Sequence, residues 1–173
     1  MNLRISKYNP SYRDNNGNYN REEWTSVHDI GKQFAGKVLS VDEYLTWERA
    51  YVAFILCLFS SIKEDSVHLN YIEGDQRGWD KARKHAKKNH LDHILTEKIP
   101  ALGAAISLHE LSDIVRACMR EFVWAKVEAH DLCTLRFGYD FYMYVAGTSV
   151  KSVHKKTASH FGLFAERIQK LSY

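Results

Sequence analysis

Three closely spaced histidines, His85, His90 and His93, are the first side chains of this sequence to consider for chemistry. In a helix His90 and His93 would lie one turn apart, and Asp92 adds a carboxylate beside them. A zinc site built from histidines normally needs further histidine or cysteine ligands, and the basic residues between 81 and 88 would repel a dication. We therefore expect solvent-exposed histidines here, and neither a metal nor a cofactor.

Two histidine–carboxylate pairs are the candidates for acid–base catalysis. His109 precedes Glu110, and His130 precedes Asp131, so either pair could supply part of a nuclease mechanism. Neither pair belongs to a recognisable catalytic motif, and the chain contains no P-loop, H-E-x-x-H, G-x-S-x-G or C-x-x-C pattern. We expect a protein that is not an enzyme.

A basic stretch at residues 77–98 is the strongest nucleic-acid signal. Its lysines and arginines exceed its acids, and phosphate binding needs such a surface. Stacking aromatic residues are largely missing, with only Trp79 present, and lysines at helical spacing also describe an ordinary solvated face. Nucleic-acid binding through this helix is the alternative function.

Acidic residues flank a predicted strand at 67–73 and suggest a different partner. An inhibitor of a basic nuclease could cover the nuclease active site with carboxylates, which would speed association. The same residues are also explained as ordinary charges of loops and helix ends, and the net charge of +3 argues against a simple acidic mimic. The candidate partner-binding acids are Glu64, Asp65, Glu73 and Asp75.

A predicted hairpin in the C-terminal half supplies the aromatic contact candidates. Its alternation places Phe141, Met143 and Val145 on one face, which we expect to be core, and tyrosines on the other. Exposed tyrosines make good interface anchors, although a sheet covered on both faces would bury them. The candidates are Tyr139, Asp140, Tyr142 and Tyr144.

A long apolar helix must organise the core. Ser40 and Glu43 form a capping-box pattern, which predicts a helix from about 41 to 63 that is apolar on every face and therefore buried. A second capping box at Ser107 and Glu110 predicts a helix to about residue 128. Further predicted elements are a strand at 2–8, a basic helix at 79–89, helical residues at 91–97, the hairpin at 132–145, a helix at 150–160, and a strand or helix extension at 162–168.

These elements predict an α+β fold in one domain, residues 1–173. A central helical bundle surrounds the buried helix at about 41–63, with short strands at the N-terminus and a C-terminal hairpin, helix and strand unit. The longest apolar run, residues 50–59, is too short to span a membrane, and the N-terminus lacks an apolar signal region. Three cysteines, Cys57, Cys118 and Cys133, are best interpreted as reduced thiols of a cytoplasmic protein.

Three segments also resemble a known family. The order K-Y-N-P-x-Y-R-D-x-N-G-x-Y-x-x-E-E-W-T-S-x-x-D-I-G at residues 7–31, F-G-Y-D-F-Y-M-Y at 137–144 and G-L-F-A-E-R at 162–167 resembles bacterial immunity proteins of contact-dependent growth inhibition and polymorphic toxin systems. The resemblance implies a protein that binds and neutralises a cognate toxin domain, expected to be a nuclease, in a one-to-one complex. It also implies that Tyr8, Tyr12, Tyr19 and Trp24 pack across the body of the fold as scaffold.

Overall fold

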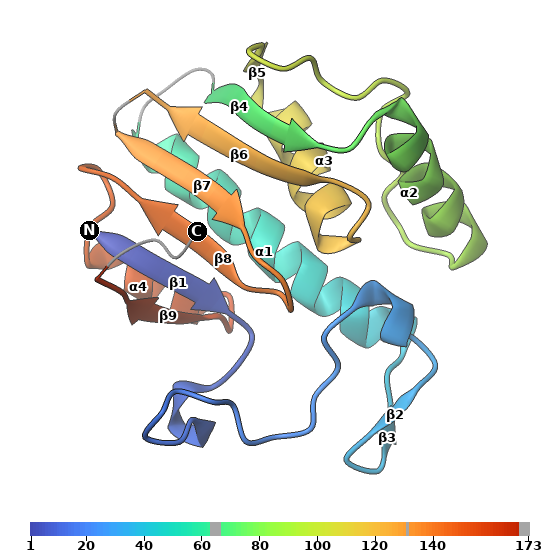
Figure 1. Ribbon diagram of the computed structural model, residues 1–173, viewed down its shortest axis with the longest axis vertical. Coiled ribbons are helices and arrows are strands. Elements are labelled where there is room, and N and C mark those ends of the chain that lie inside the picture. Colours follow the sequence, from blue (N-terminus) through green and yellow to red (C-terminus); the bar gives the residue numbers. More distant parts are fainter. Residues whose placement is uncertain (63–66, 131, 170–173) are drawn as a thin grey trace.

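A seven-stranded antiparallel sheet forms one layer of the computed structural model, which describes residues 1–62, 67–130 and 132–169. The strands follow one another across the sheet in the order β5-β4-β6-β7-β8-β1-β9 (Figure 1). Their bounds are Asn2–Ser6 (β1), Val67–Glu73 (β4), Ala105–Ile106 (β5), Trp124–Ala129 (β6), Cys133–Phe137 (β7), Met143–Ala146 (β8) and Phe164–Arg167 (β9).

Helices form the second layer, on one face of this sheet. In Figure 1, α1 (Val41–Ile62) and α3 (Leu108–Met119) run behind the strands, and α4 (Val153–His160) lies with β9 at one edge. The remaining helix, α2 (Gln76–Lys88), follows the end of β4, and a small hairpin of β2 (Gln33–Phe34) and β3 (Lys37–Val38) precedes α1. The expected α+β fold and its central helix are confirmed.

The central helix α1 begins at its predicted first residue and ends one residue before its predicted last residue, 63. Ser40 accepts a hydrogen bond from the N–H of Glu43, while the Glu43 carboxylate pairs with Lys37, so half of the predicted capping box forms. By length and composition α1 could cross a membrane. However, one side of the helix, including Phe54, Ile55 and Phe59, is fully buried between sheet and helices. It is therefore packed as the core helix of a globular domain.

The sheet is larger than the sequence predicts, because the helix expected to continue to residue 128 stops at Met119. The Ser107–Glu110 capping box forms as predicted. Beyond the helix, Glu121 adopts a left-handed backbone (φ 62°), and the N–H of Phe122 donates to the carbonyl of Ala117. Helices often end on such a left-handed residue, but it is usually glycine. The chain then forms β6, whose residues alternate between half-buried and buried.

The segment 89–99 was expected to be partly helical and is not. His90 is left-handed (φ 56°), which ends α2. After this point the backbone is held mainly by side chains of other elements: the indole of Trp79 donates to the carbonyl of Thr96, and Arg83 donates to that of Leu95. Tertiary partners thus replace the hydrogen bonds that a helix would make.

The two termini of the described chain meet at the β9 edge. For residues 162–168 the sequence allows either a strand or an extension of the preceding helix. The structure contains a strand there, β9, which pairs with β1. The predicted hairpin forms from β7 and β8, and Phe141, Met143 and Val145 are buried as expected. The three cysteines are free thiols; Cys118 and Cys133 are buried and Cys57 is exposed.

The aromatic N-terminal loop packs as scaffold. Tyr8 and Trp24 are buried, and the Lys7 ammonium lies 4.3 and 4.2 Å from the centres of their rings. Lys7 also donates to Glu23, which accepts a 2.5 Å hydrogen bond from the Tyr19 hydroxyl. Burial lowers the pKa of Lys7 from its usual value. Short 3₁₀ turns at Pro10–Tyr12 and Val27–Asp29 complete this loop.

Candidate functional site

The face of the sheet opposite α1 and α3 carries no helix within the described chain, and its side chains form a row across six strands. The six cross-strand partners of this row are four charged residues and two tyrosines. In register from β4 to β9 they are Tyr71, Lys126, Arg136, Tyr144, Arg4 and Glu166. The outward face of an antiparallel sheet is usually polar, so the aromatic members of this row are unusual.

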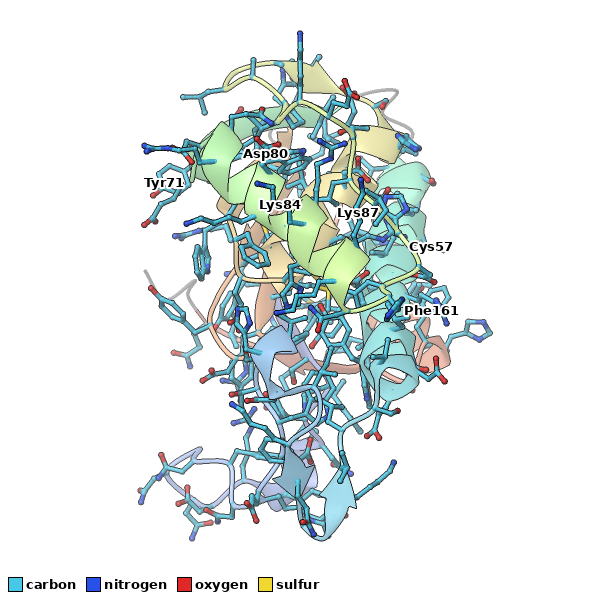
Figure 2. The ribbon with its side chains drawn as sticks, turned by 90° about the vertical axis from the view of Figure 1, so that its right-hand side faces the viewer. Cys57, Tyr71, Asp80, Lys84, Lys87 and Phe161 are labelled. Carbon is cyan, nitrogen blue, oxygen red and sulfur yellow. The ribbon has the colours of Figure 1, made fainter. Side chains whose placement is uncertain are left out.

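A groove of about 630 Å³ lies at the β4–β8 end of this open face. Tyr139 is 77% exposed, and Tyr71 is 50% exposed and projects away from the sheet (Figure 2). The Tyr139 ring packs against Trp124, with ring centres 5.8 Å apart. We call this surface the aromatic groove; its lining residues are Asn70, Tyr71, Glu73, Trp124, Ala125, Lys126, Arg136, Phe137, Gly138, Tyr139 and Tyr144.

A contact with helix α1 holds the turn that carries Tyr139 in one conformation. Asp140 and Phe141 both have left-handed backbones (φ 55° and 60°); aspartate tolerates this conformation, but it is strained for a bulky residue such as Phe141. The Phe141 side chain is buried, and its carbonyl accepts a 2.5 Å hydrogen bond from the Tyr51 hydroxyl. Strain of this kind persists only where surrounding contacts impose it, and it is concentrated at functional sites. The exposed Tyr139 is therefore displayed by a fixed turn.

Charges of both signs border the groove. Lys126 pairs with Glu128, and this hydrogen bond is the main reason that the pKa of Glu128 lies below its usual value. On β4 the Tyr71 hydroxyl donates to Glu73 at 3.1 Å, which raises the pKa of Tyr71. The groove thus combines a large apolar contact area with hydrogen-bonding groups and charges of either sign.

The residues predicted to bind a partner do not all lie together. Glu73, Tyr139 and Tyr144 line the groove, and the exposed Asp140 is next to it in the turn. Asp75 instead caps α2, accepting a hydrogen bond from the N–H of Gly78 and pairing with Arg77. The other two predicted acids, Glu64 and Asp65, fall outside the described residues.

Tyr142 faces the N-terminal loop. Its ring lies 5.3 Å from that of Tyr8, its hydroxyl accepts a 2.8 Å hydrogen bond from Arg13, and the Arg4 guanidinium lies over its ring. Arg13 also pairs with Glu166 of β9 at 3.4 Å. The three segments that carry the family resemblance therefore pack against one another as one part of the scaffold.

Tyr71 and Trp124 are members of the groove that sequence reasoning missed. The alternation of the predicted strand 67–73 places Tyr71 on the face of Val67 and Leu69, which are buried, whereas a register shift between Leu69 and Tyr71 turns Tyr71 outward. Trp124 lay within a stretch assigned to a helix, and that assignment concealed its outward position on β6.

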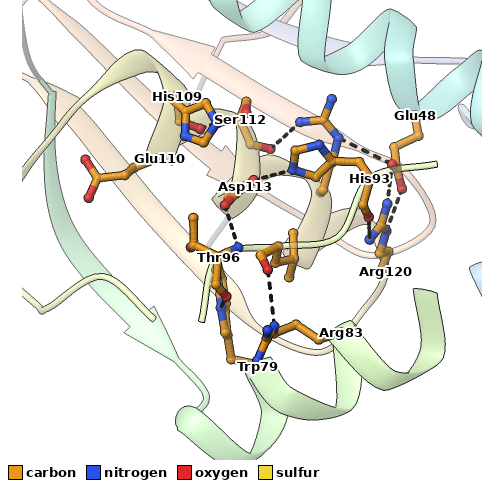
Figure 3. Close-up of polar contacts among 12 residues, drawn as sticks. Glu48, Trp79, Arg83, His93, Thr96, His109, Glu110, Ser112, Asp113 and Arg120 are labelled. Carbon is orange, nitrogen blue, oxygen red and sulfur yellow. Dashed lines mark hydrogen bonds and ion pairs between the residues drawn. The ribbon is translucent and has the colours of Figure 1, made fainter. Parts of the chain in front are cut away.

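A buried ionic network links α1, α3 and the segment 89–99 behind the sheet (Figure 3). Glu48 accepts hydrogen bonds from Tyr44 and, at 2.8 and 2.7 Å, from Arg120; both members of this ion pair are buried. Burial lowers the pKa of Arg120, but its hydrogen bonds to Glu48 raise it, and the net shift is upward. A third bond of Arg120 goes to the carbonyl of His93. Because these buried groups provide hydrogen-bond partners for one another, the network holds α1, the end of α3 and the segment 89–99 together.

The candidate catalytic and metal-binding histidines serve separate parts of the fold. His85 packs against His28 and Phe122, and burial lowers its pKa. His93 bonds Asp113 at 2.6 Å, and the partner of His109, Glu110, is engaged in the capping box.

The second catalytic pair is only partly described. The His130 ring lies 5.4 Å from that of His68, while Asp131 falls outside the described residues. Across the described ranges, 1–62, 67–130 and 132–169, no group of three or more metal-ligand side chains is placed to hold an ion.

Comparison with models of known protein families, with curated proteins and with solved structures found no match for this chain.

Proposed function

We propose that this chain is a cytoplasmic immunity protein that binds a toxin domain in a one-to-one complex, with the aromatic groove as its contact surface. The toxin, which we expect to be a nuclease, is neutralised because the bound protein covers its active site or blocks access of its substrate. The protein needs no cofactor and carries out no catalysis in this role.

The observation that carries the proposal is the composition of the groove. Tyrosine, tryptophan and arginine are the residue types that dominate the binding energy of protein interfaces, and the groove presents Tyr71, Trp124, Tyr139, Tyr144 and Arg136 together. Each aromatic side chain buries a large area while losing few rotatable bonds. The mixed charges at the border suit the polar rim that surrounds an interface core.

Rigid display of Tyr139 is a second support. An inhibitor gains affinity when its anchor is already held in the bound conformation, because less conformational entropy is lost on binding. The left-handed Phe141, which is fixed by burial and by the Tyr51 hydrogen bond, provides such a preorganised turn beside Tyr139. The choice of a toxin as the partner rests on the resemblance of residues 7–31, 137–144 and 162–167.

The proposal is tested by co-expression with the toxin domain encoded in the neighbouring reading frame. We expect a one-to-one complex in size-exclusion chromatography with light scattering. Tyr71→Ala and Tyr139→Ala should each weaken the affinity about 30-fold or more, since truncating a hot-spot residue costs about 2 kcal/mol or more. Val153→Ala is the control, because Val153 is also an exposed apolar residue (55%) but lies on α4, away from the groove.

Two results would count against the proposal. Absence of a complex with that domain would remove the immunity function. If both tyrosine variants bind the toxin domain with the same affinity as Val153→Ala, the interface lies outside the groove.

A further inference from the structure

The exposed face of α2 is a second charged surface, separate from the aromatic groove. The helix buries Trp79, Ala82 and Ala86, which recur every three or four residues and so share one side. Its opposite side presents the exposed lysines Lys81, Lys84, Lys87 and Lys88. Figure 2 shows Lys84 and Lys87 on the helix that faces the viewer, while Tyr71 projects from the left-hand side.

These four lysines keep their charge available to a partner. The other two cations of α2 are already engaged: Arg77 pairs with Asp75, and Arg83 donates to the carbonyl of Leu95 and lies 3.8 Å from Asp80. Among the ion pairs found within the described residues, none includes a lysine of α2. The lysine face is thus a row of uncompensated ammonium groups about 10 Å long, from the helical rise of 1.5 Å per residue.

We propose that the lysine face of α2 binds the phosphate backbone of duplex DNA without reading its base sequence. Lysine ammonium groups spaced along a helix suit repeated phosphates, and such contacts are electrostatic and independent of sequence. This function is additional to the proposed toxin binding and uses a different surface.

The chemistry of the face argues against three other partners. Lysine is depleted from the cores of protein interfaces, where aromatic anchors are expected, and the tryptophan of α2 is buried. A membrane surface would require an apolar face free to enter the lipid, but the apolar face of α2 packs against its own domain. Single-stranded nucleic acid is normally held by exposed aromatic residues on which bases stack.

The size of the effect follows from counterion release. Each lysine–phosphate contact contributes about −0.9 to the slope of log K against log salt, so four contacts give a slope of about −3.6. Raising the salt from 50 to 200 mM should then weaken binding about 150-fold, and a protein that retains one contact should lose only about 3.5-fold. Non-specific affinities of this kind lie at a Kd of about 10⁻⁴ to 10⁻⁶ M at physiological salt.

The test measures fluorescence anisotropy of a labelled 20-base-pair DNA duplex at several salt concentrations. The variant K81Q/K84Q/K88Q removes three charges from α2, and K151Q/K155Q/K156Q removes three from α4 and the residue that precedes its cap, which gives a control of identical net charge. We expect the α2 variant to lose most of the salt dependence and the control to keep it.

Other results would overturn the inference. Equal losses in the two variants would show that only net charge matters, and no binding to the duplex at 20 mM salt would exclude the site. Competition by polyglutamate as effective as competition by unlabelled DNA would assign the face to an acidic protein instead. Circular dichroism of both variants checks that they are folded. Five of the six lysines are exposed and Lys155 is half-buried, and none of them belongs to an ion pair of the described chain, so we expect unchanged spectra.

Discussion

Glu48→Gln should cost this protein much of its stability, because it leaves Arg120 in the core without a counter-charge. The Arg120 side chain is fully buried and donates two hydrogen bonds to the Glu48 carboxylate. Breaking a buried ion pair by removing the charge of one partner typically costs about 3–5 kcal/mol. Whole domains are stable by only about 5–15 kcal/mol, so the expected loss is a large fraction of the total.

Glu43→Gln is the matched control, made near the start of the same helix. Glu43 pairs with Lys37, whose side chain is 76% exposed, and exposed ion pairs contribute about 0–1 kcal/mol. In urea unfolding at pH 7, with a slope of about 2 kcal/mol per molar, Glu48→Gln should lower the midpoint by roughly 2 M and the control by less than about 0.5 M. A difference below 1 kcal/mol between the two variants would refute the argument.

A double variant tests whether the loss of stability comes from the uncompensated charge of Arg120. Replacing both partners by apolar residues, Glu48→Leu with Arg120→Met, removes both buried charges at once. Such replacements are often close to neutral, since neither member of the pair is then left buried alone; the partly exposed Arg116 loses its 3.6 Å ion pair with Glu48 in both variants. The double variant should therefore be more stable than Glu48→Gln alone, and a greater loss would show that the charges themselves are stabilising.

Two further predictions concern buried polar groups. The Tyr8 hydroxyl is buried with no hydrogen-bond partner in the described chain, whereas that of Tyr51 donates to the carbonyl of Phe141. Tyr8→Phe should thus keep or slightly raise the free energy of unfolding, while Tyr51→Phe should lower it by about 1–3 kcal/mol; equal effects in denaturant unfolding would contradict this. The pKa of His154 is lowered mainly by burial and secondly by the charge of Lys151. The His154 side chain therefore binds a proton more readily in the unfolded chain than in the folded one, and stability falls as the pH drops below about 6.5. His154→Asn, which keeps an acceptor near the N–H donor of Lys151, should reduce this pH dependence, by up to about 1.4 kcal/mol per unit; an unchanged pH profile of unfolding would exclude His154 as its source.

The family resemblance and the architecture rest on different kinds of information. The motif at residues 7–31 was interpreted as a scaffold in which aromatic side chains pack across the fold, and Tyr8 and Trp24 are indeed buried there. The immunity function and the identity of its partner stay predictions, whose tests are the toxin complex and the groove variants. The contacts of Lys7 with these rings explain how the loop is held against the fold.

Part of the candidate site was visible in the sequence because it depends on local periodicity. Tyr144 was identified from the alternation of the hairpin, which depends only on the two-residue repeat of a strand, and Tyr139 lies in the turn of that hairpin. Trp124 was not identified, because W-A-K-V-E-A is compatible with both a strand and a continued helix, and the residue that ends α3 is a left-handed glutamate with no sequence signal.

The sequence by itself determined the elements whose signals are local: the apolar helix α1, the capped start of α3, the strand β4 and the β7–β8 hairpin. Only the tertiary structure decided what those elements bring together. The aromatic groove joins Tyr71 of β4 and Trp124 of β6, which are far apart along the chain, through the pairing of these two strands, and the β7–β8 turn adds Tyr139. The segment 89–99 lost its expected helix because side chains of α2 and α3 bind its backbone. Such contacts depend on which residues of distant segments meet in space, and local sequence patterns cannot predict them.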